Sequence, residues 1–292
     1  LKLRKIIKSQ DPDVIVSFLS RINVAVALAA FRLRSSLIIC ERSWPPFVSL
    51  NKKILWFRKI IFKNVKKIVV QTTKSKKWLE KGLSQIEVIV IPNPTLYPIP
   101  ISRQNIINPR SIVNESRRII LASGRMDKVK QFDLLIKAYS KIKNSHDNWD
   151  LVILGEGIER KSLDSLVESL KLKKRVFLPG KVGNISEWYE RANLFVLSSQ
   201  VEGFPNVLLE AMSYGIPSIS FDCDTGPRDM IEQGVNGVLI NPKEKDVGLS
   251  EAMNELIMNK EYRQKLSENS VLVREKYSLS NVMDKWNRAL GL

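Results

Sequence analysis

Short runs of apolar residues alternate with helical patterns along the chain. Short continuous Val/Ile/Leu runs between helices are typical of a parallel sheet that is covered on both faces. The pattern therefore predicts an α/β protein. Four runs precede residue 100 and six follow residue 117: Val14–Leu19, Leu37–Cys40, Lys67–Gln71 and Val88–Ile91, then Arg118–Ala122, Leu151–Leu154, Val176–Leu178, Leu194–Ser198, Ser218–Phe221 and Gly237–Ile240.

The two groups of runs are separated by a stretch rich in prolines, Pro92–Glu115, which has the composition of an interdomain linker. We expect a first domain at 1–100, a linker at 101–116, a second domain at 117–278 and a C-terminal helix at 279–292, capped by Ser278 or Ser280. Six strands suffice for a complete doubly wound sheet, whereas four do not. We therefore expect the first domain to be incomplete at its N-terminus.

Composition narrows the class of protein without naming a function. Hydrophobic residues make up 44% of the 292 residues and charged residues 26%, which excludes a disordered or collagen-like chain. Cys40 and Cys223 are far apart, so a disulfide framework and a thiolate zinc site are excluded too. We expect both cysteines to be buried and the protein to reside in the cytoplasm.

The positive charge is concentrated in the first third of the chain. Of the net +17, residues 1–100 contribute +14, because they hold 19 Lys and Arg against 5 Asp and Glu. Such asymmetry predicts an anionic partner for this region. No recognition module or zinc spacing accompanies the charge, so a membrane surface is preferred to nucleic acid.

A basic, aromatic-rich segment at Asn51–Val69 is the candidate membrane contact. Helical spacing places four apolar residues on one core face and leaves three others beside the lysines of the Lys52–Lys67 helix. The alternative is a packed structural helix with a solvated basic stripe. The core-face residues are Ile54, Phe57, Ile61 and Val65, and the off-face residues are Leu55, Trp56 and Phe62.

The most specific motif runs from Leu194 to Gly215 and is typical of a strand, a loop and a helix. Pro205 suits the start of the helix and Gly215 its end. Glu202 would then lie at the mouth of the helix, with Glu210 one to two turns further. Because a helix N-terminus attracts anions and a carboxylate accepts from vicinal hydroxyls, this spacing favours a nucleotide-sugar site.

A second motif, Ile119–Gln131, places Arg125 and Lys130 after another strand. Both side chains leave the tip of the strand, so both are candidates to neutralise one diphosphate without a metal ion.

Together these motifs resemble the donor domain of retaining nucleotide-sugar glycosyltransferases of family 4, which have the GT-B architecture. The resemblance extends over about residues 11–292 and includes Ile91–Pro94, Gly155–Gly157 and Phe221–Arg228. The last of these is similar to bacterial members that build lipid-linked or surface polysaccharides. The resemblance as a whole implies two Rossmann-like domains that face each other across a cleft.

The resemblance also implies roles for individual residues. Arg125 and Lys130 would hold the donor diphosphate, Glu202 the transferred sugar and Glu210 the ribose hydroxyls. The remaining expected donor contacts are Gly124, Gly203, Phe204 and Asn206, with Val182 in the Pro179–Asn184 stretch near the base.

Three features depart from the family pattern. Gln131 stands where a glycine is usual, which we expect to change the turn but not the cations. The single histidine, His146, falls in a polar loop and is expected to be a surface residue, although many members use a histidine in the first domain. Glu41 and Arg42 occupy the corresponding strand tip.

Other mechanisms stay open at this point. Glu202 is a possible covalent nucleophile, although the family implies front-face transfer assisted by the donor phosphate. The pairs Asp11/Asp13 and Asp222/Asp224 match a two-aspartate metal pattern of another architecture. A nucleotide-sugar epimerase of the same fold, or a non-catalytic donor-binding remnant, is the alternative function.

The resemblance thus predicts a retaining glycosyltransferase that moves a sugar, most simply from a UDP-sugar, to a hydroxyl of a polyprenyl-linked or saccharide acceptor. It predicts no cofactor and no metal. With the basic first domain, it predicts peripheral attachment to the inner face of the cytoplasmic membrane.

Overall fold

The computed structural model describes residues 2–44, 60–62 and 65–292. Every one of the ten predicted apolar runs overlaps a β-strand, and all the strand pairs are parallel. The α/β prediction is therefore confirmed. The strands are β1 (Val14–Phe18), β2 (Ser36–Glu41), β3 (Lys67–Val70), β4 (Glu87–Val90), β5 (Arg118–Ser123), β6 (Trp149–Leu154), β7 (Val176–Gly180), β8 (Leu194–Leu197), β9 (Ser218–Phe221) and β10 (Val238–Ile240).

Helices connect the strands, as parallel pairing requires. The first domain contains α1 (Lys2–Gln10), α2 (Ser20–Ala29) and α4 (Thr73–Gly82). After the short α5 (Pro109–Ile112) come α6 (Phe132–Ile142), α7 (Arg160–Ser169), α8 (Ile185–Arg191), α9 (Asn206–Ser213), α10 (Pro227–Met230), α11 (Lys245–Met258), α12 (Lys260–Ser270), α13 (Val273–Lys276) and α14 (Leu279–Leu290), with 3₁₀ turns η2 (Lys128–Lys130) and η3 (Pro242–Glu244).

The second sheet has the strand order β10-β9-β8-β5-β6-β7, which is the doubly wound Rossmann order. One of its faces is covered by α6, α7 and α11 and the other by α8 and α9. The order reverses between β5 and β8. In sheets of this kind the ligand site lies outside the carboxyl ends of the strands at that reversal.

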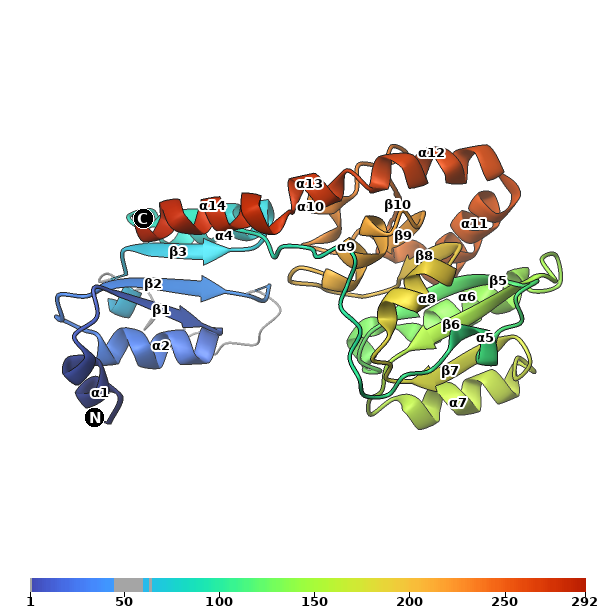
Figure 1. Cartoon of the computed structure of the whole chain (residues 1–292), viewed down its shortest axis with the longest axis horizontal. Helices are drawn as coiled ribbons and strands as arrows, with labels where there is room; N and C mark the ends of the chain where they lie inside the picture. Colours follow the sequence, from blue (N-terminus) through green and yellow to red (C-terminus); the bar gives the residue numbers. More distant parts are fainter. Residues whose placement is uncertain (1, 45–59, 63–64) are drawn as a thin grey trace.

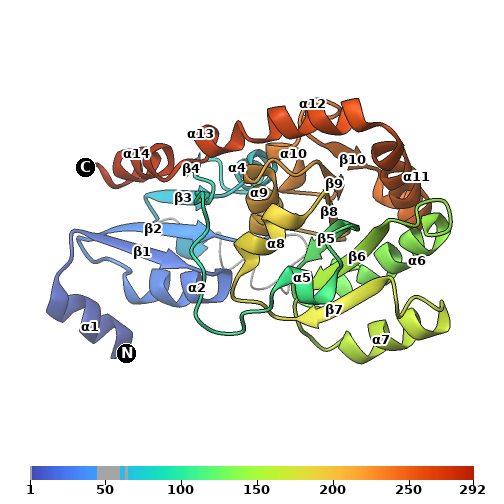
Figure 2. The ribbon, with the colours of Figure 1, turned by 45° about the vertical axis from the view of Figure 1, so that its right-hand side comes forward.

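The first sheet has the sequential order β1-β2-β3-β4. Apolar residues of α2 and α4 cover one face, and α14 covers the other. Figures 1 and 2 show how α14 returns from the second domain to lie along the first sheet. Ser278 caps this helix by accepting from the Asn281 amide, as predicted.

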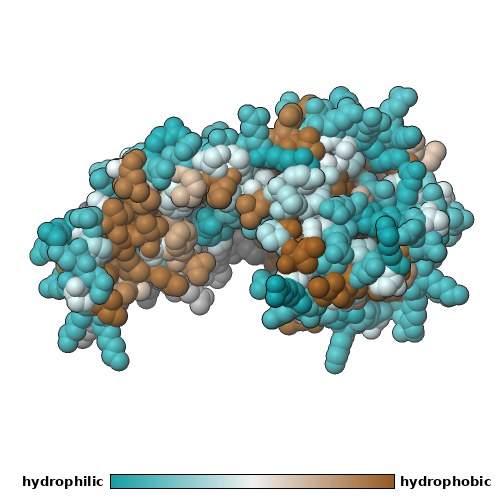
Figure 3. Space-filling view, viewed as in Figure 1, coloured by the Kyte–Doolittle hydropathy of each residue, from teal (hydrophilic) through white to brown (hydrophobic). Residues whose placement is uncertain are grey.

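The described part of the first sheet ends in an apolar edge at β1. Figure 3 shows apolar residues gathered on the outer face of this domain, over β1 and α2. The exposed members are Val16, Phe18, Leu19, Ile22, Leu28 and Phe31.

One prediction for the basic segment is wrong. Phe62 is fully buried in the core of the first domain and does not lie on an outer face beside lysines. It stands in a 3₁₀ turn directly after a helical residue, so regular helical spacing no longer applies at this position. Ile61 and Val65 are buried as predicted. Ile54, Leu55, Trp56 and Phe57 lie outside the described residues. In the described part of the chain, no helix has the length and apolar character to cross a membrane.

Candidate active site

The loop after β5 carries the first pair of candidate residues. Asp127 organises this loop, because its carboxylate accepts from the amides of Val129 and Lys130 at 3.1 and 3.3 Å. Gln131 follows in the left-handed conformation, with φ of 48°. Glycine adopts this conformation without strain, so the backbone makes a glycine-type turn here although the residue is glutamine.

The loop after β8 is bound to the loop after β5. Gln200 donates its amide proton to the Val129 carbonyl at 2.8 Å, and the Ser198 hydroxyl donates to the Lys130 carbonyl at 2.8 Å. These contacts position the Lys130 ammonium 2.6 Å from Glu202 Oε1. Both side chains are largely buried, with exposed fractions of 18% and 11%.

Gly124 makes room for this ion pair. A β-carbon on Gly124 would lie 3.2 Å from Lys130 Cε, which is tighter than nine in ten such contacts, so the Lys130 side chain would have to shift by a few tenths of an ångström. The Arg125 side chain is not part of this ion pair. Its Nε lies 2.7 Å from Asp127 Oδ2, and the side chain is 80% exposed. The structure thus brings Lys130 to Glu202 but pairs Arg125 with a separate carboxylate.

The segment between Glu202 and α9 faces the first domain. A β-carbon on Gly203 would lie 2.6 Å from the Arg42 carbonyl oxygen, so only glycine fits between the domains at this position. Phe204 is buried against Tyr277, with ring centroids 5.9 Å apart. Helix α9 begins at Asn206, and Pro205 is its N-cap. The Thr225 hydroxyl donates to the Glu202 carbonyl and fixes the loop from the other side.

Glu210 lies one turn into α9 and accepts a hydrogen bond from the Tyr189 hydroxyl at 2.9 Å. Burial raises the pKa of the Glu210 carboxyl, and the Tyr189 hydrogen bond offsets part of that effect. Glu210 lines a cavity of about 310 Å³, together with Asn206 and residues from the first domain and the linker.

Arg42 is a residue of this region whose orientation the sequence does not reveal. Its guanidinium donates to Asn93 Oδ1 at 2.6 Å, and Asn93 donates to Asn206 Oδ1 at 2.8 Å. Arg42 thereby joins the tip of β2 to the start of α9, and it lines the same cavity as Glu210. Its neighbour Glu41 is buried and accepts from the Ser20 hydroxyl. The only sequence signal was the position of both residues at a strand tip.

Val182 is half-buried and packs against the core beneath α8 and α9. The adjacent Gly183 is hydrogen-bonded at its amide to the Asn105 carbonyl and at its carbonyl to the Ser102 amide, each at 2.9 Å. The linker therefore covers this stretch, and Val182 is not among the residues that line the cavity of Glu210.

His146 is buried, so the prediction of a surface loop residue is wrong. Its Nε2 lies 2.7 Å from Asn254 Oδ1, because α11 covers the loop before β6. Cys40 and Cys223 are buried as predicted, and burial raises the pKa of both thiols to about 12.

Three of the four aspartates in the two pairs are engaged with basic side chains. Arg34 binds Asp11, Arg228 binds Asp222, and Lys74 lies 2.7 Å from Asp224. Within residues 2–44, 60–62 and 65–292, no three His, Cys, Asp or Glu side chains are grouped in a way that suits a metal ion.

Comparison with solved structures identifies the architecture. The chain superimposes on Anabaena HepE in complex with UDP with a TM-score of 0.86 at 18% identity, covering 99% of this chain and 81% of that one. It also matches sucrose-phosphate synthase from Thermosynechococcus elongatus with a TM-score of 0.81 at 19% identity, covering 98% and 76%. The fold is GT-B, as predicted.

Comparison by sequence gives the family. Residues 104–272 match the family described as glycosyl transferases group 1. The chain belongs to this family. An uncharacterised glycosyltransferase from Haemophilus influenzae is 27% identical, covering 99% of this chain and 79% of that protein.

A second relative, from Campylobacter jejuni, is 29% identical, covering 99% of this chain and 77% of its own length. It is named as an N-acetylgalactosaminyltransferase that acts on an undecaprenol-diphosphate-linked saccharide.

Proposed function

We propose that the protein transfers a sugar from a UDP-sugar to a hydroxyl of a lipid-linked or saccharide acceptor, with retention of anomeric configuration. One observation carries this proposal. The Lys130–Glu202 ion pair joins the loops after β5 and β8, the two strands between which the order of the second sheet reverses. A cation and a carboxylate therefore share the position where a doubly wound sheet binds nucleotides.

In this proposal Lys130 turns from Glu202 to the donor diphosphate, and Arg125 reaches the same group from the exposed loop. Their positive charge stabilises the diphosphate as it leaves, which is where catalysis by charge is most effective. Glu202, released from the ion pair, accepts hydrogen bonds from hydroxyls of the transferred sugar, and Glu210 accepts them from the ribose. Gly124, Gly203, Phe204 and Asn206 complete the proposed donor contacts, whereas Val182 is left out because the linker covers its stretch.

The reaction is a front-face exchange at the anomeric carbon. The bond from this carbon to the diphosphate oxygen breaks, and the acceptor oxygen forms its bond on the same face. The acceptor proton passes to the departing diphosphate oxygen, so atoms and charges balance without a covalent enzyme intermediate. No cofactor is required in this scheme, and the two basic side chains take the place of a metal ion.

Two of the similar proteins support the choice of substrates. HepE contains UDP in its structure, and the Campylobacter jejuni relative is named for a polyprenyl-diphosphate acceptor. The Arg125/Lys130 pair ahead of the Glu pair favours transfer over epimerisation.

The direct test is calorimetry with UDP, GDP and their sugar conjugates, followed by NMR of the transferred linkage. We expect micromolar binding of UDP and an axial anomeric product from an axial donor. Activity should persist in EDTA. Conversion of the UDP-sugar to its epimer, inversion at the anomeric carbon, or loss of activity in EDTA with rescue by Mn²⁺ would each contradict this mechanism.

We further propose that the first domain attaches the protein to the inner face of the cytoplasmic membrane. The support is the net charge of +14 over residues 1–100, because each Lys or Arg near an anionic surface contributes about 1 kcal/mol. Co-sedimentation with liposomes should depend on anionic lipid and weaken with salt, and Trp56→Ser should weaken it further. Binding that ignores lipid charge would refute this attachment.

A further inference from the structure

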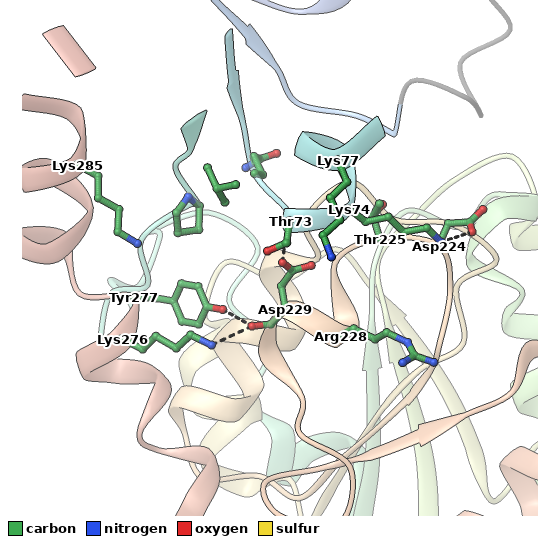
Figure 4. A pocket seen from close by; sticks show the side chains of 13 residues that line it. Thr73, Lys74, Lys77, Asp224, Thr225, Arg228, Asp229, Lys276, Tyr277 and Lys285 are labelled. Atoms are coloured by element: carbon green, nitrogen blue, oxygen red, sulfur yellow. Dashed lines mark hydrogen bonds and ion pairs between the residues drawn. The ribbon is translucent and has the colours of Figure 1, made fainter. Parts of the chain in front are cut away.

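A larger cavity, of about 610 Å³, lies between the two domains beside the candidate donor site. Figure 4 shows its walls, which come from α4, from the loop before α10, from α13 and from α14. None of the residues to which we assign donor contacts lines it. Its charged residues are Lys74, Lys77, Arg228, Lys276, Lys285, Asp224 and Asp229, five basic side chains against two carboxylates.

Two of the basic side chains enter the cavity without a partner among the residues that the structure describes. Lys77 extends from α4 and Lys285 extends from α14, and both point into the cavity from different walls (Figure 4). Among the described residues, neither ammonium group has a hydrogen bond or an ion pair. By contrast, Lys74 is paired with Asp224 at 2.7 Å, and Lys276 donates to the Asp229 carbonyl at 3.0 Å. The cavity therefore holds positive charge that no described residue neutralises.

A buried donor in the same cavity also lacks a partner among the described residues. Gln71 follows β3 and is only 5% exposed, and its Nε2 atom makes no hydrogen bond within the described part of the chain. An unsatisfied buried amide destabilises a protein, so such groups usually meet a ligand or water. Gln71 lines the cavity with Lys77 and Lys285. The missing partner has to be a hydrogen-bond acceptor, which is also what the two lysines require.

The walls around these donors are fixed by one hydrogen bond between the domains and by two within the second domain. Asp229 Oδ1 accepts from the Thr73 amide at the start of α4 at 2.9 Å, and the Tyr277 hydroxyl donates to the Asp229 carbonyl at 2.5 Å. Thr225, which also lines the cavity, donates to the Glu202 carbonyl. Thr225 is therefore in direct contact with both the cavity and the loop that carries Glu202.

We propose that this cavity binds the diphosphate of a lipid-linked acceptor, through Lys77, Lys285 and Gln71. A diphosphate offers only acceptor oxygens and several negative charges, which match two ammonium groups and an amide that have no partner in the described part of the chain. This assignment rests on the proposed transfer to a lipid-linked saccharide. It adds a second anion site that is separate from the donor site and has contributions from both domains.

The first test measures binding of inorganic diphosphate by calorimetry in the full chain carrying Lys130→Ala and Arg125→Ala, which disable the proposed donor site. In this background, Lys77→Ala and Lys285→Ala should each weaken binding about five- to tenfold, and Gln71→Leu severalfold. Lys81→Ala on α4 and Arg288→Ala on α14 are matched controls, because both residues are exposed and lie outside the cavity. Equal binding by cavity and control variants would overturn the proposal.

The second test separates a lipid diphosphate from a free one. Farnesyl diphosphate in detergent micelles should bind more tightly than inorganic diphosphate and lose affinity in Lys77→Ala, whereas farnesol should not bind. If inorganic diphosphate binds but farnesyl diphosphate binds more weakly, the site belongs to a free anion and the acceptor role is refuted. Affinity for UDP in the otherwise unchanged chain should be the same in wild type and cavity variants. If wild type does not bind UDP, the proposed function fails, independently of the cavity.

Discussion

Lys130 and Glu202 are separated by 72 residues, yet the ammonium nitrogen lies 2.6 Å from the carboxylate oxygen. Because the Glu202 side chain is only 11% exposed, removal of its partner leaves a carboxylate with poor access to water. We expect Lys130→Ala to reduce the free energy of unfolding by about 1–3 kcal/mol and to lower kcat sharply. Urea denaturation and steady-state kinetics measure the two effects.

Arg125→Ala is the matched control for that variant. Its side chain is 80% exposed, so the free energy of unfolding should change by less than about 0.5 kcal/mol while kcat still falls. If both variants have the free energy of unfolding of the wild type, the Lys130–Glu202 ion pair does not stabilise the fold.

Glu210→Gln tests the ribose contact. The amide loses the negative charge that two ribose hydroxyls would bind, and hydrogen bonds to a charged group contribute about 1.5–3 kcal/mol. UDP should bind roughly 10- to 150-fold more weakly in calorimetry. Tyr189→Phe should have a smaller effect, because it removes only the hydroxyl that orients Glu210. Unchanged affinity for UDP in Glu210→Gln would exclude the assignment.

The pH dependence of stability gives a second view of Glu210. Burial raises the pKa of its carboxyl in the folded protein, so the folded state holds this proton more tightly than the unfolded state. The contribution of Glu210 to stability is therefore present below the unfolded pKa and is lost as pH rises through the folded pKa. The stability of Glu210→Gln relative to wild type should increase over this range, as followed by urea denaturation at several pH values. A constant difference would show that Glu210 does not titrate abnormally.

Gly155→Ala tests how closely the loops after β5 and β6 approach each other. Gly155 has φ of +131°, and a β-carbon there would lie 1.9 Å from the Gly124 carbonyl oxygen. The backbone would have to move at Gly124, beside Arg125, at a cost of about 2–4 kcal/mol in unfolding free energy. Gly82→Ala, at the end of α4 with open space around it, should be neutral or slightly stabilising. Equal unfolding midpoints for the two variants would show that the loops have room for a side chain at Gly155.

The strands of both sheets were predictable because each is a short run of apolar residues bounded by polar ones. The resemblance assigned Lys130 to the diphosphate and Glu202 to the sugar of one donor, but it did not predict the direct ion pair between them. The partner of each charged side chain depends on packing, which the sequence pattern does not reveal. Arg125 and Lys130 look equivalent in sequence, but one is turned toward Asp127 and the other toward Glu202.

Three places in the fold show where sequence patterns fail. His146 lies among polar residues in the sequence and is nevertheless covered by α11, a contact between segments about 100 residues apart. Phe62 is buried because the helix changes to a 3₁₀ turn at its position. Lys77 and Lys285 meet in one cavity only because α14 crosses back to the first domain. No local pattern encodes such crossings.

The return of α14 to the first sheet also restricts how the two domains move. The chain passes between the domains twice, after β4 and before α14, and the two passages are joined by a hydrogen bond of 2.8 Å from the Thr95 amide to the Tyr277 carbonyl. Two adjacent connecting segments that are hydrogen-bonded to each other are expected to act as a hinge with a defined axis. A single linker would allow rotation of the domains about any axis. We therefore expect any opening between the domains to be a rotation about residues 92–95 and 277–278, so that the proposed donor and acceptor would approach each other along the arc that this hinge allows.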